Sequence, residues 1–283
     1  MFGFLNINKP VNITSHDVIS YLRKITKIKR IGHAGTLDPF ACGVLPVAIG
    51  NATRLFEYFD DDKEYIAEIS FGKNTDTFDT EGQVTEVFDK KISEPEILNI
   101  LENFQGEIEQ IPPIYSAIKV NGKKLYEYAR EGKNVELKPR KVTIENLVLK
   151  NFNNTEQKAE VIIKCSKGTY IRSLAYDIGK QLNCGAFLSK LTRTQAGNFY
   201  IKDSVNLYDI KTIEDVIKNL KEPTLNLPHA EINEIEAKKI SMGQFLKNKQ
   251  NFSDGDIIVL THNNKMCAIA KIQDNLIKAG KVL

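Results

Sequence analysis

The chain has 283 residues, of which 42% are hydrophobic and 27% are charged. This composition is typical of a soluble globular protein, and it excludes low-complexity disorder and collagen-like repeats. The net charge of +3, from 39 basic and 36 acidic residues, favours no class of partner by itself.

The length predicts one large domain followed by a small one. No apolar run approaches the ~18 residues of a membrane-spanning helix. Residues 1–9 contain no basic leader and are interrupted by asparagines, a pattern that argues against a secretory signal. We therefore expect a cytoplasmic protein that does not associate with a membrane.

The first part of the chain predicts strands and helices that do not alternate strictly, as they would in a parallel sheet. Alternating or continuous apolar runs predict strands over residues 2–8, 44–49 and 63–71. Signals that start a helix occur at Thr14 and Ser93. Residues 31–40 carry two glycines and a proline without periodicity, which predicts a loop.

The second part continues with two predicted strands, over residues 142–150 and 158–165. They lead through Gly168 into a helix with one apolar stripe. After a break near residues 221–228, a short helix and three short strands are predicted, over residues 235–246, 257–261, 266–272 and 276–282. We expect an α+β fold, with a mixed, largely antiparallel sheet flanked by helices in residues 1–222 and a small β module in residues 223–283.

Basic residues gather in two segments. The first has no acidic residue and comprises Arg23, Lys24, Lys27, Lys29 and Arg30. The second, residues 119–141, has eight basic residues against three acidic ones, and the basic ones are Lys119, Lys123, Lys124, Arg130, Lys133, Lys138, Arg140 and Lys141. Both segments are consistent with a polyanionic partner, and from charge alone a solvated surface is an equally good interpretation.

Metal and redox chemistry have no support in the sequence. The four cysteines lie far apart without a Cys-x-x-Cys pair, and the four histidines share no zinc-finger or helical spacing with them. No G-x-G-x-x-G segment is present either. We expect no metal, no disulfide framework and no cofactor.

The segment that points most clearly to chemistry is residues 32–46, GHAGTLDPFACGVLP. Asp38 precedes a proline, which restricts its backbone to extended conformations, and the nearby glycines allow tight turns around it. A carboxylate held on a stiff loop suits nucleophilic or acid–base catalysis. For the Asp-Pro dipeptide alone an ordinary turn is the better interpretation, but the whole segment favours a functional one.

Residues 32–46 closely resemble the catalytic motif of the TruB family of tRNA pseudouridine-55 synthases. Four further blocks resemble the family's motifs in the family's order, at residues 8–15 (NKPVNITS), 63–65 (KEY), 166–172 (SKGTYIR) and 183–193 (NCGAFLSKLTR). Asn12 stands where the family pattern usually has glycine, and asparagine tolerates a left-handed backbone better than most residues. Residues 223–283 resemble, more weakly, a PUA-type RNA-binding domain.

The resemblance implies a pseudouridine-synthase fold and an isomerisation. The N-glycosidic bond of a uridine in the T loop of tRNA is cut, the uracil turns over, and its C5 is joined to C1′ of the ribose. Because composition and redox state do not change, no cofactor is implied. The implied partner is tRNA, and a protein that holds one RNA arm is expected to be a monomer.

The resemblance also implies the catalytic residues. Asp38 is implied to be the essential carboxylate, Arg172 to pair with it, and Tyr65 to stack on the uracil and take part in proton transfer. Arg172 falls in the first turn of a predicted helix, where the helix dipole disfavours a cation unless a carboxylate faces it. Without the resemblance, Tyr65 is equally well a core aromatic and Arg172 an ordinary surface arginine.

Other residues are implied to bind the nucleotide or to support the site. His33 is implied to help hold the target nucleotide outside its stack, because a base inside a folded loop must be flipped out. Tyr170 and Leu191 are implied to line the uridine pocket, and Lys9 and Pro10 to support the catalytic loop. Without the resemblance, Tyr170 and Leu191 are simply expected in the core.

The second basic segment falls where the family carries an inserted loop that clamps RNA, here about residues 112–141. Lysines supply phosphate contacts, and tyrosines in the same region can stack on unpaired bases. The residues expected to bind RNA are Lys119, Lys123, Lys124, Arg130 and Lys133.

Two other functions compete with this one. A non-catalytic RNA-binding or RNA-folding protein needs none of Asp38, Tyr65 and Arg172, so their joint presence argues against it. A glycosidase acting on a free nucleoside needs a second carboxylate within reach, and the Asp38 loop offers no obvious one.

Overall fold

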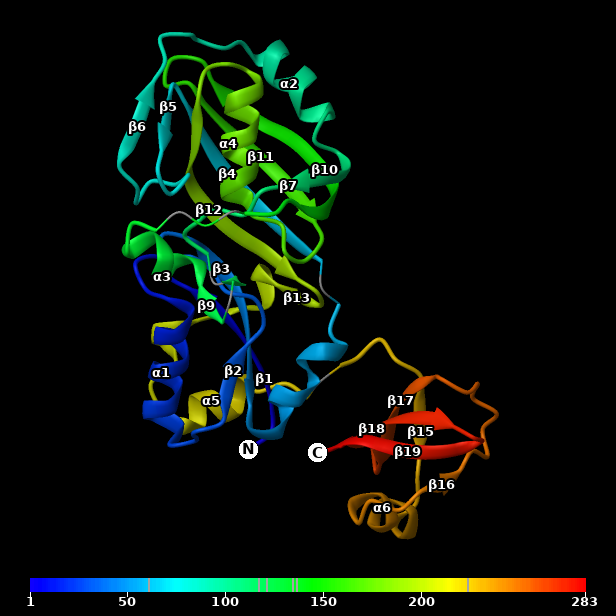
Figure 1. Cartoon of the computed structure of the whole chain (residues 1–283). Coiled ribbons are helices and arrows are strands. Elements are labelled where there is room, and N and C mark those ends of the chain that lie inside the picture. Colours follow the sequence, from blue (N-terminus) through cyan, green and yellow to red (C-terminus); the bar gives the residue numbers. More distant parts are fainter. Residues whose placement is uncertain (61, 117, 121, 134, 136, 223) are drawn as a thin grey trace.

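The computed structural model describes residues 1–283 except 61, 117, 121, 134, 136 and 223, and it leaves the side chains of residues 126 and 130 undescribed. The described residues form a ten-stranded sheet with helices packed on it and a separate five-stranded sheet beside it (Figure 1). The two chain ends lie close together, because Met1, Phe2 and Leu283 border one shallow depression (Figure 1). The predicted α+β class is confirmed.

The large sheet is mixed and largely antiparallel, as the sequence predicts. Its strands in spatial order are β14 (Val205–Asn206), β1 (Gly3–Lys9), β3 (Cys42–Ile49), β12 (Ala186–Ala196), β4 (Lys63–Phe71), β11 (Lys158–Cys165), β10 (Arg140–Asn153) and β7 (Gly106–Gln110). At its sides, β2 (Ile31–His33) pairs with β3 and β13 (Phe199–Tyr200) pairs with β12. Among the described pairs of this sheet, β1 with β14 and β3 with β12 are parallel.

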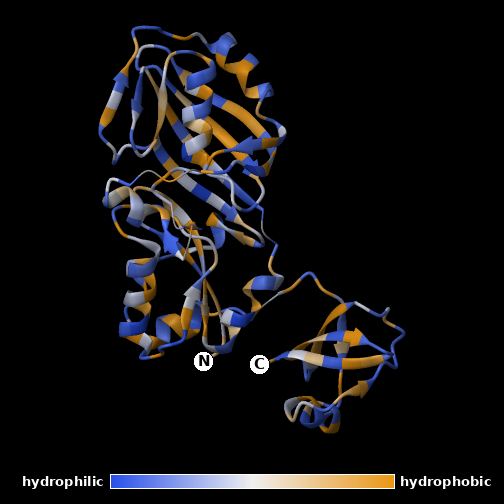
Figure 2. Ribbon diagram, in the orientation of Figure 1, coloured by the Kyte–Doolittle hydropathy of each residue, from blue (hydrophilic) through white to orange (hydrophobic). Residues whose placement is uncertain are grey.

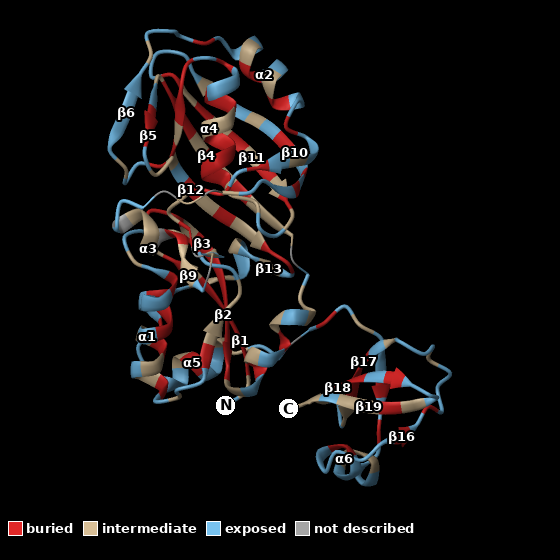
Figure 3. Cartoon of the chain, in the orientation of Figure 1, coloured by how far each residue is buried: buried red, intermediate tan, exposed pale blue. Residues whose placement is uncertain are grey.

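One end of the sheet is covered by α2 (Glu94–Glu102) and α4 (Ile171–Gln181) (Figure 1). Strand β4 alternates as predicted, and it turns Tyr65, Ala67, Ile69 and Phe71 toward the core. The helices place an apolar stripe against this face, formed by Ile97, Leu101, Leu174, Ala175 and Ile178. The buried residues therefore concentrate between the sheet and these two helices (Figure 3).

The other end is covered by α1 (Ser15–Thr26) and α5 (Ile213–Asn219). Helix α1 starts at the predicted capping box, in which the hydroxyl of Thr14 accepts from the Asp17 N–H at 3.1 Å and the Asp17 carboxylate accepts from the Thr14 N–H at 2.8 Å. Val18, Ile19 and Leu22 are buried, and their spacing puts them on one face of the helix. The helix amphipathicity thus closes a second apolar cluster against β1 and β3.

The remaining elements of this part are short. They are the 3-10 helices η1 (Gly50–Tyr58), η2 (Ile201–Asp203) and η3 (Leu207–Asp209), the hairpin strands β5 (Lys73–Thr75) and β6 (Val84–Val87), and β8 (Lys119–Val120), β9 (Lys123–Lys124) and α3 (Leu125–Arg130). The last three belong to the basic segment.

The C-terminal sheet has the order β15 (His229–Glu231), β17 (Ile257–His262), β18 (Lys265–Gln273), β19 (Leu276–Val282) and β16 (Leu246–Lys247), with α6 (Glu234–Ser241) alongside. Two tight turns join its three long strands, and Asn263, Asn264, Asp274 and Asn275 all have positive φ there. Hydrophobic residues recur along the strands of both sheets, whereas hydrophobic and hydrophilic residues alternate along the helices (Figure 2).

Apolar contacts connect the small sheet to the large one. Val259 and Ile269 are buried in one cluster with Phe4 and Leu55. At the edge of this contact the ammonium group of Lys281 pairs with a carboxylate of η1 at 2.9 Å. The C-terminal sheet therefore packs against β1 and η1.

Two expectations about local structure are corrected. Residues 31–33, expected in a loop, form strand β2, because β3 offers a free edge with which Ile31 and His33 pair. The predicted helix over residues 235–246 ends at Ser241, since Gly243 takes a positive φ of 75° that ends the helix. In the part of the chain that the structure describes, no helix has the length and apolar character needed to cross a membrane.

Candidate active site

The loop between β2 and β3 carries Asp38, and hydrogen bonds fix it on both sides of this residue. The hydroxyl of Ser15 accepts from the Leu37 N–H at 2.8 Å and donates to the Leu37 carbonyl at 3.1 Å. The N–H of Asn12 donates to the Pro39 carbonyl at 2.8 Å. The carboxylate of Asp38 is therefore presented on a stiff loop, as its sequence predicts.

Lys9 lies beneath the same loop with its side chain fully buried. Its ammonium group donates to the carbonyls of Pro10, Ile13 and Pro39 at 2.8, 2.7 and 3.3 Å. Burial lowers the pKa of Lys9 to about 8. Asn12 has a φ of 64°, so it takes the left-handed conformation expected where the family pattern has glycine. Lys9 and Pro10 thus lie under the loop and outside the cavity described next.

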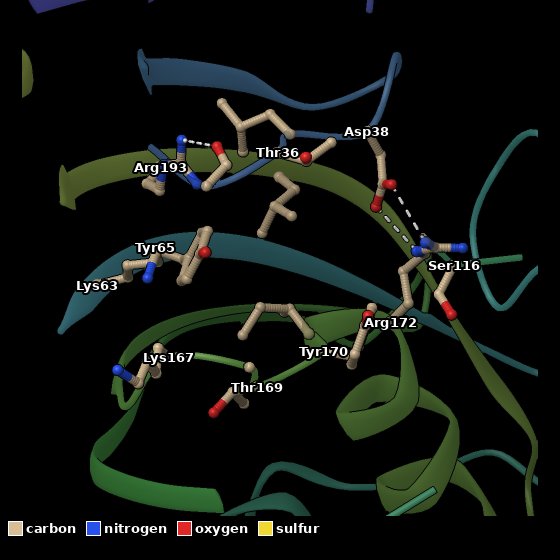
Figure 4. Close-up of a pocket in the computed structure, with 15 residues that line it drawn as sticks. Thr36, Asp38, Lys63, Tyr65, Ser116, Lys167, Thr169, Tyr170, Arg172 and Arg193 are labelled. Carbon is tan, nitrogen blue, oxygen red and sulfur yellow. Dashed lines mark hydrogen bonds and ion pairs between the residues drawn. The ribbon is translucent and has the colours of Figure 1, made fainter. Parts of the chain in front are cut away.

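Arg172, at the start of α4, forms a two-point ion pair with Asp38 (Figure 4). Its Nε lies 2.9 Å from Oδ2, and its second terminal nitrogen donates to Oδ1 at 3.1 Å. The arginine side chain is 5% exposed and that of Asp38 is 33% exposed. Burial raises the pKa of Asp38, and the adjacent guanidinium opposes that shift. The arginine therefore favours the ionised carboxylate in a partly desolvated site.

Further groups hold the guanidinium of Arg172 in place. It donates to the carbonyls of Thr77 at 3.2 Å and Tyr115 at 2.9 Å. A second carboxylate, that of Asp79, lies 3.4 Å from it and is 4% exposed. Asp79 itself accepts from the hydroxyl of Thr77 at 2.5 Å. Arg172 thus bridges two carboxylates, and Asp79 holds it from the side away from the cavity.

A cavity of about 400 Å³ opens beside Asp38. Five of the residues predicted for the site line it together, namely Asp38, Tyr65, Tyr170, Arg172 and Leu191. They come from the β2–β3 loop, β4, β12 and the start of α4, which the sheet order brings side by side. The volume is in the range typical of small-ligand sites.

Tyr65 forms one wall of this cavity and is 6% exposed. Burial raises the pKa of its phenol, and the charge of Arg193 opposes that shift. Arg193 is the direct partner of Tyr65 in the pairing of β12 with β4. The site therefore holds two arginines, one at the carboxylate and one at the phenol (Figure 4).

His33 ends β2, at the start of the loop that carries Asp38, and it does not line the cavity. Burial, followed by the charges of Arg193 and His16, lowers the pKa of its ring. Its Nδ1 is buried and has no hydrogen-bond partner among the described residues. His33 therefore lies next to the site without joining the group around Asp38.

The predicted RNA-binding residues lie in the basic segment, away from the cavity. Lys123 and Lys133 both pair with the carboxylate of Glu131, the latter at 3.0 Å. Lys119 is exposed, Lys124 is half-buried in β9, and the side chain of residue 130 lies outside the described part of the structure. The structure does not bring these residues together with Asp38.

The base of the basic segment is nevertheless fastened to the cavity wall. The side chain of Gln110 accepts from the Tyr170 N–H at 2.7 Å and donates to the Tyr170 carbonyl at 3.0 Å. The hydroxyl of Ser173 donates to the Ile111 carbonyl at 2.8 Å. Together with the Tyr115 carbonyl on Arg172, these bonds connect the segment to the first turn of α4.

The chain matches the profiles of two known domain families. The profile of the TruB family pseudouridylate synthase N-terminal domain matches residues 23–171, and that of the tRNA pseudouridylate synthase B C-terminal domain matches residues 172–226. The chain belongs to the TruB family. Membership of this pseudouridylate synthase family makes it an isomerase.

Individual TruB relatives are similar over nearly their whole length. A protein named tRNA pseudouridine synthase B from Clostridium tetani is 40% identical, and the match covers 100% of this chain and 100% of that protein. A protein of the same name from Staphylococcus aureus is 42% identical over 99% of this chain and 98% of that protein. One from Caldanaerobacter subterraneus is 45% identical over 88% of this chain and 87% of that protein.

Solved structures show the same fold. The crystal structure of a Cbf5-Nop10-Gar1 complex matches with a TM-score of 0.71 at 24% identity, covering 99% of this chain and 84% of that one. The structure of an H/ACA RNP bound to a substrate RNA containing 2′-deoxyuridine matches with a TM-score of 0.70 at 22% identity, with the same coverage. The pseudouridine-synthase-like fold is thereby confirmed.

Two residues at this candidate site, Asp79 and Arg193, were not predicted from the sequence. Asp79 lies among several acidic residues in the segment TDTFDTE, and nothing in the sequence distinguishes it before the fold places it against Arg172. Arg193 ends the block at residues 183–193 that resembles the family, but its burial is visible only in the structure.

Proposed function

We propose that the protein is a tRNA pseudouridine synthase that converts a T-loop uridine, at position 55 of tRNA, to pseudouridine. The observation that carries this proposal is the two-point pair of Asp38 with Arg172 on the wall of a cavity that Tyr65 also lines. The names of the full-length relatives, tRNA pseudouridine synthase B, support tRNA as the substrate.

Asp38 is proposed as the essential carboxylate. When the N-glycosidic bond breaks, positive charge develops on the ribose, and an ionised carboxylate stabilises it either by bonding to the sugar or by taking a proton from it. Arg172 keeps Asp38 ionised and oriented, since a planar guanidinium fixes both carboxylate oxygens. Asp79 is proposed as a positioning residue that holds Arg172.

The other cavity residues are proposed to retain the detached uracil while it turns over. Tyr65 offers a flat ring for stacking, and Tyr170 and Leu191 offer further apolar wall. A base inside a folded T loop can reach this cavity only after it is flipped out of its stack. His33, at the start of the catalytic loop, is proposed to contact the flipped nucleotide.

The basic segment is proposed to clamp the RNA arm through Lys119, Lys123, Lys124, Arg130 and Lys133. The ion pairs of Lys123 and Lys133 with Glu131 are exposed, and such pairs stabilise by at most about 1 kcal/mol, so phosphates can replace the carboxylate. The hydrogen bonds that attach the start of the segment to Tyr170 and Arg172 support a clamp that is connected to the cavity wall.

We further propose residues 1–222 as the catalytic domain and residues 223–283 as a PUA-like RNA-binding module. The isomerisation requires no cofactor or metal. We propose that the protein acts as a monomer, because all the proposed catalytic groups come from one chain. We also propose that the protein acts on tRNA in the cytoplasm.

The alternative function is that of a non-catalytic RNA-binding protein. Such a protein does not need the Asp38–Arg172 pair, so this function leaves the pair unexplained. A nucleoside glycosidase is disfavoured because the second carboxylate at Arg172, that of Asp79, is paired with this arginine and does not line the cavity. One assay separates the three functions. An unmodified tRNA transcript incubated with the protein yields pseudouridine for the proposed enzyme, free uracil for a glycosidase, and neither product for a binding protein. Either of the last two results overturns the proposal.

A further inference from the structure

Arg193 is a buried cation that the proposed reaction does not yet use. Its side chain is fully buried. Its Nε donates to the Val44 carbonyl at 2.7 Å and a terminal nitrogen donates to the Gly35 carbonyl at 2.9 Å (Figure 4). Within the described residues no carboxylate forms a salt bridge with it, and a buried charge without a counter-ion is costly unless an anion is formed nearby.

The two carbonyls bound by Arg193 lie on either side of the catalytic loop. Strand β3, which follows the loop, also approaches the backbone of Arg193 very closely, because a Cβ added at Gly43 would lie 2.3 Å from the Arg193 carbonyl, and Gly43 has a φ of 103°. Arg193 therefore closes the base of the loop that presents Asp38. This part of its role is structural.

The charge of Arg193 acts on Tyr65. The two residues are direct partners in neighbouring strands, and both line the cavity. Burial raises the pKa of the phenol, and the positive charge of the guanidinium opposes that shift. The other charged or titratable groups that affect this phenol are Cys165 and Asp38, and both raise its pKa. Arg193 thus supplies the positive charge that opposes the rise in the pKa of Tyr65 caused by burial, Cys165 and Asp38.

Isomerisation of uridine moves protons at two atoms of the uracil, C5 and N1, and the phenol of Tyr65 beside Arg193 can carry them. Uridine has an N1–C1′ bond and a C5–H bond, whereas pseudouridine has a C5–C1′ bond and an N1–H bond. One proton must therefore leave C5 and one must reach N1, with no oxidant or reductant involved. A single group that first donates and then accepts satisfies this balance.

We propose that Arg193 is a positioning residue that stabilises the phenolate of Tyr65 while Tyr65 carries this proton. The phenol gives its proton to N1 of the detached uracil and becomes a phenolate next to Arg193. After the C5–C1′ bond has formed, the phenolate takes the proton from C5 and is a phenol again. This inference rests on the proposed function. It adds that Arg193 is the group that stabilises the phenolate of Tyr65.

A double-mutant cycle tests the inference. We measure tritium release from C5 of the target uridine in tRNA under single-turnover conditions, for wild type, Arg193→Gln, Tyr65→Phe and the double variant. Gln keeps an amide donor for one loop carbonyl and removes the charge, and thermal unfolding shows whether each variant is folded. Lys190→Met, an exposed change on the same strand, is the matched control.

We expect Arg193→Gln to slow release by about 30-fold when Tyr65 is present and by less than about 5-fold in the Tyr65→Phe background. Equal factors in the two backgrounds would overturn the inference, because a purely structural loop clamp acts whether or not the phenol is present. The control should stay within about 2-fold of wild type.

A second measurement does not depend on activity. Tyrosine labelled with ¹³C at Cζ reports each phenol's ionisation by NMR, and the Tyr65 signal is assigned by its absence in Tyr65→Phe. We expect the pKa of Tyr65 to be higher in Arg193→Gln than in wild type, and an unchanged pKa would overturn the inference. Failure of the proposed function is distinguishable, since wild type would then form no pseudouridine at all.

Discussion

Replacing Asp79 by asparagine removes one of the two carboxylates on Arg172 and leaves the shape of the side chain nearly unchanged. At 3.4 Å, Coulomb's law with an effective dielectric constant of about 20 gives an attraction of about 5 kcal/mol. Arg172 keeps Asp38 and two backbone carbonyls as partners. We therefore expect about half of this energy to be lost from the transition state, which slows the reaction by about 30- to 150-fold.

The same substitution should also shift the acidic limb of the pH–rate profile in a definite direction. The negative charge of Asp79 raises the pKa of Asp38. In the proposed mechanism Asp38 acts as a carboxylate, so we expect the wild-type rate to fall as the pH drops through its pKa. Without the charge of Asp79 that pKa is lower, so the acidic limb of the pH–rate profile should move to lower pH even though the maximum rate falls.

The assay is single-turnover formation of pseudouridine in a tRNA transcript at saturating enzyme, measured across the acidic range. Glu81→Gln is the control, because it removes a charge from the same loop without contacting Arg172. A rate for Asp79→Asn within a few-fold of wild type, or an acidic limb displaced to higher pH, would refute the reasoning.

Asp38→Asn should abolish turnover while tRNA affinity in a filter-binding assay stays within a few-fold of wild type; substantial residual product would remove Asp38 from the mechanism. Arg172→Lys should reduce kcat severely, because a flexible ammonium cannot reproduce the planar two-point pair, and near-normal kcat would show that the pairing is dispensable. Joint replacement of Lys123, Lys124 and Lys133 by alanine should flatten the dependence of log K on log[salt] by up to about two units without changing which uridine is modified, and an unchanged slope would mean that these lysines do not contact phosphate.

The fold was largely predictable because most elements carry local signals. Strand β4 coincides with the predicted residues 63–71, and β11 and β19 also have their predicted bounds. Strand β2 was missed because three residues with a central glycine form a strand only when an edge is available to pair with them. The pairing of β3 with β12, which joins residues about 150 apart in sequence, has no local signal at all.

The site was predicted in part, and the limit has a physical cause. Asp38 and Arg172 lie in motifs that could be found separately, and the structure joins them across 134 residues. Asp79 and Arg193 act through burial and contact, and neither property can be derived from their neighbours in sequence. His33 lies beside the cavity and not in its wall, and its contact with the nucleotide stays a prediction.

The most direct measurement uses a tRNA transcript in which the T-loop uridine at position 55 alone carries tritium at C5. With wild-type protein we expect the label to be released in equal amount to the pseudouridine formed, with no free uracil, and Asp38→Asn should release none. Label that stays on the RNA after prolonged incubation with the wild-type protein, or label recovered in free uracil, would contradict the proposed isomerisation at Asp38.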